Sequence, residues 1–172
     1  MTPNIFIEDF ERTTNSDYLH GVLGRALIIA TRFDSSCKAL SEVKDVDTQA
    51  MIFFHKLDIK VESNLKEKLA DFKKLSEAIK QLKLSDEIAT ILFKANSARN
   101  KIAHDVAKGL EGCIDSKVDD IFIENIGKLV GDITEGDIVV SALISNFNKD
   151  PKMNIEEILQ YKDKVIDWVI KA

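Results

Sequence analysis

The segment Asp17–Lys44, DYLHGVLGRALIIATRFDSSCKALSEVK, decides the fold class. Its apolar side chains recur at intervals of three and four residues, the spacing that gathers them on one face of an α-helix. That face comprises Leu19, Val22, Leu23, Ala26, Leu27, Ala30, Phe33, Cys37 and Leu40. We therefore expect an amphipathic helix over 17–44, with Ser16 or Asn15 as its N-cap and a break at 45–47.

Helical periodicity continues through the rest of the chain, and the whole sequence contains only two prolines and seven glycines. Ser85, followed by two acidic residues, is a favourable helix start. Segment 137–147 is rich in β-branched residues, but a single strand would leave its backbone groups without partners, so we expect it to be helical. The expected helices span 48–84, 85–108, 117–133, 137–147 and 154–170. We expect a junction between residues 60 and 64 in the first of these, and Gly109 or Gly112 to close the second.

These segments predict an all-α fold, a helical bundle of about five to seven helices. The chain shows no internal repeat, low-complexity tract or linker, so we expect residues 1–172 to form a single domain. Its hydrophobic fraction of 45% and charged fraction of 31% are typical of a folded globule with a well-solvated surface.

The sequence favours a cytoplasmic protein. The first residues lack the basic start and apolar block of a secretory signal. The longest apolar run near the front, 26–30, is far shorter than the ~20 residues of a membrane span. Cys37 and Cys113 lie far apart and form no cluster with the three histidines, which argues against a disulfide framework and against a zinc site. We expect no cofactor and no metal.

The net charge of −5 bears on nucleic-acid binding. Stable binders usually present a basic face, because neutralising phosphates supplies most of their affinity. Any contact with RNA should therefore be transient, or assisted by a partner that supplies positive charge. A DNA-binding regulator is disfavoured, since no basic recognition helix is evident.

The segment Ser97–Asp105, SARNKIAHD, carries the candidate chemistry. If Ile102 points to the core, His104 lies about 200° round the helix and Asn100 about 160° in the other sense, so both point away from the apolar stripe. These two residues are one turn apart and can share a site. Arg99 lies nearer the edge of the stripe, where its stem can pack while its guanidinium reaches out.

The pattern Arg99-Asn100-x-x-x-His104 resembles the motif of the HEPN family, which is Arg, four to six variable residues and His, often with a polar residue after the Arg. The helices over about 17–110 also resemble that family's core, with about 115–172 as a C-terminal helical extension. The resemblance implies a homodimer in which two motif helices form one composite cleft. Small residues on this helix would permit close approach: Ala95, Ala98, Ala103 and Ala107.

Many HEPN proteins are metal-independent endoribonucleases, so the resemblance implies attack of an RNA 2′-hydroxyl on the adjacent phosphate. His104 would act as general base or acid, and Arg99 would hold the phosphate. Asn100 would orient His104 or donate to a phosphate oxygen. Such proteins occur in toxin, defence and stress systems, with an antitoxin or regulatory protein as a possible partner. Val106 stands where some family toxins carry the tyrosine that an antitoxin modifies, so that regulation is not supported.

Alternatives remain for the whole chain and for single residues. The chain could be a non-catalytic HEPN-like dimer that binds a protein or nucleotide. His104, like His20 and His55, could be an ordinary surface or structural histidine. Arg25 and Arg32, seven residues apart and nearly on one helix face, could contact phosphate or form surface ion pairs. Cys37 fits the apolar stripe as a packing residue, and Asp105 points elsewhere on the helix than His104.

Overall fold

The computed structural model describes residues 13–54, 79–80, 84–108, 119–148, 150 and 154–171. This part of the chain is all-α, as predicted, and contains no strand. Its four helices are fewer than the five to seven expected. They are α2 (Thr14–Phe54), α5 (Asp86–His104), α6 (Asp120–Asn148) and α7 (Ile155–Ile170).

The expected break at 45–47 is wrong, because α2, which is 41 residues long, continues through these positions to Phe54. An aspartate inside a helix costs only a fraction of a kcal/mol, about 0.7 at most. No glycine or proline follows Gly24 within this helix, so nothing in the backbone forces an end there. The helix expected to start at residue 48 therefore begins as part of α2. Its expected junction at 60–64 lies outside the described residues.

The helices expected over 117–133 and 137–147 are one helix, α6, of 29 residues. The prediction that 137–147 is helical is confirmed, and the separation between the two segments is wrong. Two glycines, Gly131 and Gly136, lie inside α6, although each glycine costs about 1 kcal/mol in a helix interior relative to alanine. Both glycines are buried, so packing against neighbouring helices offsets this cost.

The two glycines bring different helices close to α6. A Cβ on Gly131 would lie 3.1 Å from the Lys162 Cε of α7. A Cβ on Gly136 would lie only 2.5 Å from the Ala95 Cβ of α5 and 2.7 Å from the Phe33 Cε2 of α2. Only a glycine fits at residue 136, because contacts this short between carbon atoms are strongly repulsive.

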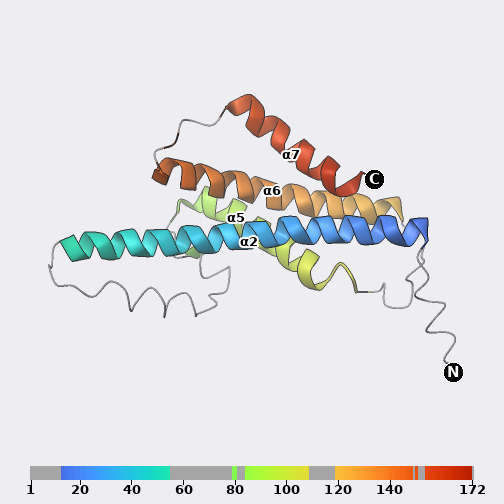
Figure 1. Ribbon diagram of the computed structural model, residues 1–172, viewed down its shortest axis with the longest axis horizontal. Helices are drawn as coiled ribbons and strands as arrows, with labels where there is room; N and C mark the ends of the chain where they lie inside the picture. The colour runs from blue at the N-terminus through green and yellow to red at the C-terminus, as the bar shows by residue number, and fades with distance from the viewer. Residues whose placement is uncertain are drawn as a thin grey trace, which may run out of the picture.

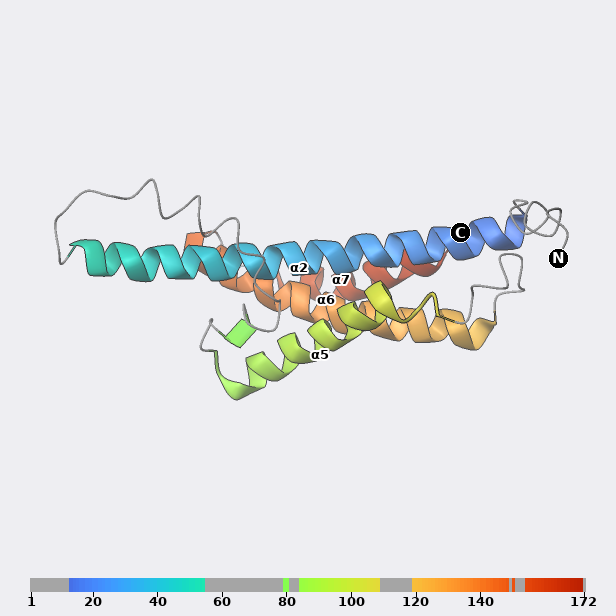
Figure 2. The same cartoon turned by 90° about the horizontal axis from the view of Figure 1, so that it is seen from below.

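The helices α2 and α6 form a central parallel pair, and α5 and α7 run antiparallel to them (Figures 1 and 2). Both α2 and α6 contact all three other helices, whereas α5 and α7 do not contact each other. The motif helix α5 therefore lies on one side of the central pair and α7 on the other. The residues expected to form a C-terminal extension supply α6, which packs at the centre of the bundle.

The buried core confirms most of the predicted apolar stripes. On α2, Leu27 departs from the stripe and is 48% exposed. On α5, Ile102 is buried as expected, together with Leu92, Ala95 and Ala98. The core residues, by helix, are Val22, Ala26, Ala30, Phe33, Cys37 and Leu40 of α2, Leu92, Ala95, Ala98 and Ile102 of α5, Ile126, Val130, Ile133 and Val140 of α6, Val165 and Val169 of α7, and also Ile79.

Side chains cap the N-termini of two helices. Thr13, not Ser16 or Asn15, is the N-cap of α2: its Oγ1 accepts from Ser16 N at 3.1 Å, and its own N donates to Ser16 Oγ at 2.9 Å. This reciprocal pair is a capping box with serine in the third helical position. Asn154, expected as the first residue of the last helix, is the N-cap of α7 and accepts from Glu156 N at 2.9 Å. No helix in the described ranges has the length and apolarity to cross a bilayer.

Candidate functional site

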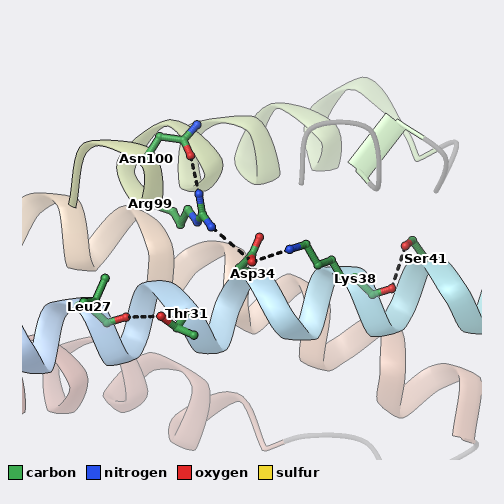
Figure 3. Close-up of polar contacts among 7 residues, drawn as sticks. All are labelled: Leu27, Thr31, Asp34, Lys38, Ser41, Arg99 and Asn100. Carbon is green, nitrogen blue, oxygen red and sulfur yellow. Dashed lines mark hydrogen bonds and ion pairs between the residues drawn. The ribbon is translucent and has the colours of Figure 1, made fainter. Parts of the chain in front are cut away.

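Arg99 points from the motif helix α5 toward α2 rather than into solvent (Figure 3). Its Nη2 lies 3.3 Å from Asp34 Oδ2, and its Nη1 donates to Asn100 Oδ1 at 2.9 Å. The Arg99 side chain is 24% exposed, so one edge of the guanidinium still meets solvent. Its position at the border of the buried stripe agrees with the prediction.

Asp34 is the residue of this site that sequence reasoning missed. It is buried on α2, and its Oδ2 also accepts from Lys38 Nζ at 2.8 Å (Figure 3). Its Oδ1 has no hydrogen-bond partner among the described residues. The available signal was an aspartate directly after the core residue Phe33, since a carboxylate at the edge of an apolar stripe needs a cationic partner.

Asn100 and His104 lie on the exposed face of α5, as predicted. Asn100 Oδ1 is occupied by the Arg99 guanidinium, and no hydrogen bond joins Asn100 to His104. Within the described residues, the His104 imidazole makes no hydrogen bond or ion pair. The structure thus brings Arg99, Asn100 and Asp34 together, and the exposed His104 lies one turn further along α5.

The carboxylate next to the motif histidine belongs to a different pair. Asp105 accepts from Lys108 Nζ, and this hydrogen bond and the positive charge of Lys108 hold the pKa of Asp105 below its usual value. Asp105 therefore does not hydrogen-bond to His104, in agreement with the weak role expected for it.

The small residues of the motif helix divide between the core and the surface. Ala95 and Ala98 are buried within the chain, and Ala95 packs where Gly136 of α6 comes closest. These two alanines are therefore not available to a second copy of α5. Ala103 is half-buried, and Ala107 is exposed but lies in the turn that follows α5, so α5 itself offers only Ala103 of the four to a second copy.

The two arginines of α2 make contacts with different helices. Arg25 Nε and Nη2 donate to the carbonyls of Val169 and Lys171 at 3.0 and 3.2 Å, which caps the C-terminus of α7. Arg32 Nη2 lies 3.6 Å from Oδ2 of the buried Asp137 on α6, so it forms an ion pair, the alternative to phosphate contact, although its partner is not a surface residue. Neither contact lies on the motif side of the bundle.

The remaining candidates are surface or packing residues, or lie outside the described ranges. His20 is exposed on α2. Cys37 is fully buried, and this burial, with the nearby charges of Asp34 and Asp137, raises the pKa of its thiol to about 12. Its predicted packing role is confirmed. His55 and Cys113 are not among the described residues.

In the described ranges, no group of three or more His, Cys, Asp or Glu side chains is arranged to hold a metal ion. No protein family model, no curated protein and no solved structure matches the chain.

Proposed function

We propose that this chain is a HEPN-type, metal-independent endoribonuclease that acts as a homodimer and cuts RNA at a composite site built from Arg99, Asn100 and His104 of two protomers. One observation carries the proposal. The Arg99 guanidinium is held by Asp34 and Asn100 at the border of an exposed helix face on which the His104 imidazole has no partner among the residues that the structure describes. Phosphodiester transfer needs a cation that binds the phosphate and an imidazole that transfers protons, and this helix carries one of each.

The roles follow from the chemistry of each group. His104 takes the proton of the 2′-hydroxyl, or donates one to the leaving 5′-oxygen, since imidazole titrates near neutral pH. A guanidinium has five N–H donors. Arg99 directs one nitrogen to Asp34 and another to Asn100, which leaves N–H groups to hold a non-bridging phosphate oxygen. The products are a 2′,3′-cyclic phosphate and a free 5′-hydroxyl, and DNA is not a substrate because it lacks the attacking group.

The geometry of a single helix favours a site shared by two chains. Arg99 and His104 are separated by about 140° and ~7.5 Å along α5, so they converge poorly on one phosphate. Leu27 lies seven residues before Asp34 and hence on nearly the same side of α2. Leu27 is 48% exposed, which supplies an apolar contact on the motif side of α2 for a second copy to cover.

The cleavage test uses purified protein and a labelled RNA in the presence of EDTA. We expect wild-type protein to cut the RNA, and His104→Ala to lower the rate by about 10²-fold or more. His20→Ala is the matched control, because it removes an exposed histidine of α2 that the proposal does not use. Equal rates for wild type and His104→Ala would overturn the nuclease proposal.

The composite site predicts complementation between inactive variants. A mixture of Arg99→Ala and His104→Ala proteins should regain part of the activity, because a heterodimer contains one intact Arg–His pair. Leu27→Glu should shift the protein to monomer in light scattering and abolish cleavage. Leu159→Glu changes a leucine of α7 that is 70% exposed, and it should leave the dimer intact.

A second candidate is a non-catalytic dimeric binding module, which one observation favours. The buried carboxylate of Asp34 already compensates the charge of Arg99, so this pair also makes sense as a purely structural link between α5 and α2. A wild-type protein that dimerises but leaves RNA uncut in EDTA would support this second candidate over the first.

A further inference from the structure

A cavity of about 250 Å³ lies on the opposite side of the central helix pair from the motif, between α6 and α7. Arg32 of α2 contributes the third wall. Its lining is mixed in polarity: Arg32, Ile138, Ser141, Asn154, Glu157, Ile158 and Tyr161. For scale, a cavity of about 150 Å³ holds benzene, whereas drug-sized ligands occupy about 300 Å³ or more. The cavity therefore suits a small metabolite.

Two opposite charges face this cavity without pairing with each other. The Arg32 side chain is 59% exposed, and its contact with Asp137 Oδ2, at 3.6 Å, is longer than a hydrogen bond. Asp137 Oδ2 instead accepts a hydrogen bond from the Tyr161 hydroxyl, with 2.7 Å between the two oxygens. Glu157 has no hydrogen-bond or ion-pair partner within the described residues. The cavity thus offers one guanidinium and one carboxylate whose hydrogen-bonding groups remain available.

We propose that this cavity binds a small free zwitterion, a molecule with a carboxylate and an ammonium group joined by a short carbon chain. The carboxylate faces Arg32, which can grip it with two N–H groups. The ammonium group faces Glu157. Ile138 and Ile158 supply the apolar surface for the carbon chain between them, and Ser141 offers a hydroxyl beside it. This site shares no residue with Arg99, Asn100 or His104 and does not depend on the nuclease proposal.

The test is a series of unbranched ω-amino acids that differ only in the distance between their charges: glycine, β-alanine, 4-aminobutyrate, 5-aminopentanoate and 6-aminohexanoate. Thermal melting and amide chemical shifts are recorded during titration of the full chain. We expect saturable stabilisation with an optimum at one chain length, and shifts concentrated at Ser141 and Ile158. Butyrate and butylamine, which each carry one of the two charges, should bind at least tenfold more weakly.

Three variants separate this site from general charge effects. Glu157→Gln should weaken binding about tenfold or more, whereas Glu124→Gln, an exposed glutamate on α6 outside the cavity, should not. Ser141→Leu fills the cavity without altering its charges and should abolish binding. Failure of every amino acid to bind at millimolar concentration, equal binding of butyrate or butylamine, or binding that persists in Ser141→Leu would each overturn the proposal.

Discussion

The guanidinium of Arg99 lies 3.3 Å from the carboxylate of Asp34, so the motif residue with the longest reach is tied to a different helix of its own chain. The pair is 24% and 12% exposed at its two side chains, which places it at the edge of the core rather than on the open surface. Such a pair both positions a functional cation and holds α5 against α2.

A double-mutant cycle measures this link. Asp34→Asn leaves the Arg99 charge without its partner, and we expect a loss of about 1–3 kcal/mol in the free energy of unfolding. Because the two side chains are in contact, Asp34→Asn and Arg99→Gln should show a coupling energy of about 0.5–2 kcal/mol in urea unfolding. Asp34→Asn combined with Lys94→Gln is the control, since Lys94 pairs with Asp132 at 2.8 Å instead. Simple additivity of Asp34→Asn and Arg99→Gln would contradict the link.

The close packing at Gly136 predicts a large difference between two glycine substitutions. Gly136→Ala should lower the free energy of unfolding by about 1–3 kcal/mol, because its Cβ would overlap Ala95 and the Phe33 ring. Gly24→Ala meets nothing within 4 Å and should raise stability by up to about 1 kcal/mol. Urea denaturation measures both. Adding Ala95→Gly to Gly136→Ala should restore part of the loss, and failure to do so would place the strain elsewhere.

Stability should fall at alkaline pH. Burial raises the pKa of Cys37 from 9.0 to about 12, and burial with the hydrogen bond to Asp137 raises that of Tyr161 from 10.0 to about 12. Both groups hold their proton more tightly in the folded chain, so their contribution is complete below about pH 9 and is lost as pH rises toward 12. Melting temperatures should therefore decline across this window.

Tyr161→Phe tests the tyrosine contribution to this decline. It should lower stability at neutral pH by about 1 kcal/mol, since Asp137 loses a hydrogen bond. Its melting temperature should then depend less steeply on pH above 10 than that of the wild type. Parallel pH profiles for the two proteins would show that Tyr161 plays no part in the alkaline loss.

The C-terminus of α7 should depend on side chains of α2. Arg25 donates to two of the last carbonyls, and the Tyr18 hydroxyl donates to the carbonyl of Ile170 at 2.8 Å. Arg25→Leu should therefore cost about 1–3 kcal/mol and speed hydrogen exchange in the last turn of α7. Lys128→Leu, on the exposed face of α6, is the control. Unchanged exchange in Arg25→Leu would mean that water caps these carbonyls equally well.

Elements whose causes are local could be predicted before the fold was known. The three-and-four spacing of apolar residues specified the buried face of α2, and the last helix was expected over 154–170, one residue from the observed start of α7. The exposure of Asn100 and His104 followed from the same helical geometry. These features need only the periodicity of one helix and its own capping groups.

Features that join distant parts of the chain depend on how the helices pack. Glycine disfavours a helix locally. The helix α6 nevertheless continues through Gly131 and Gly136, because neighbouring helices pack closely against both residues. Likewise, Arg99 could be placed at the edge of a stripe, but its partner Asp34 lies 65 residues away on α2. Contacts of this kind arise because burial brings faces together, and periodicity along one segment does not say which partner each face meets.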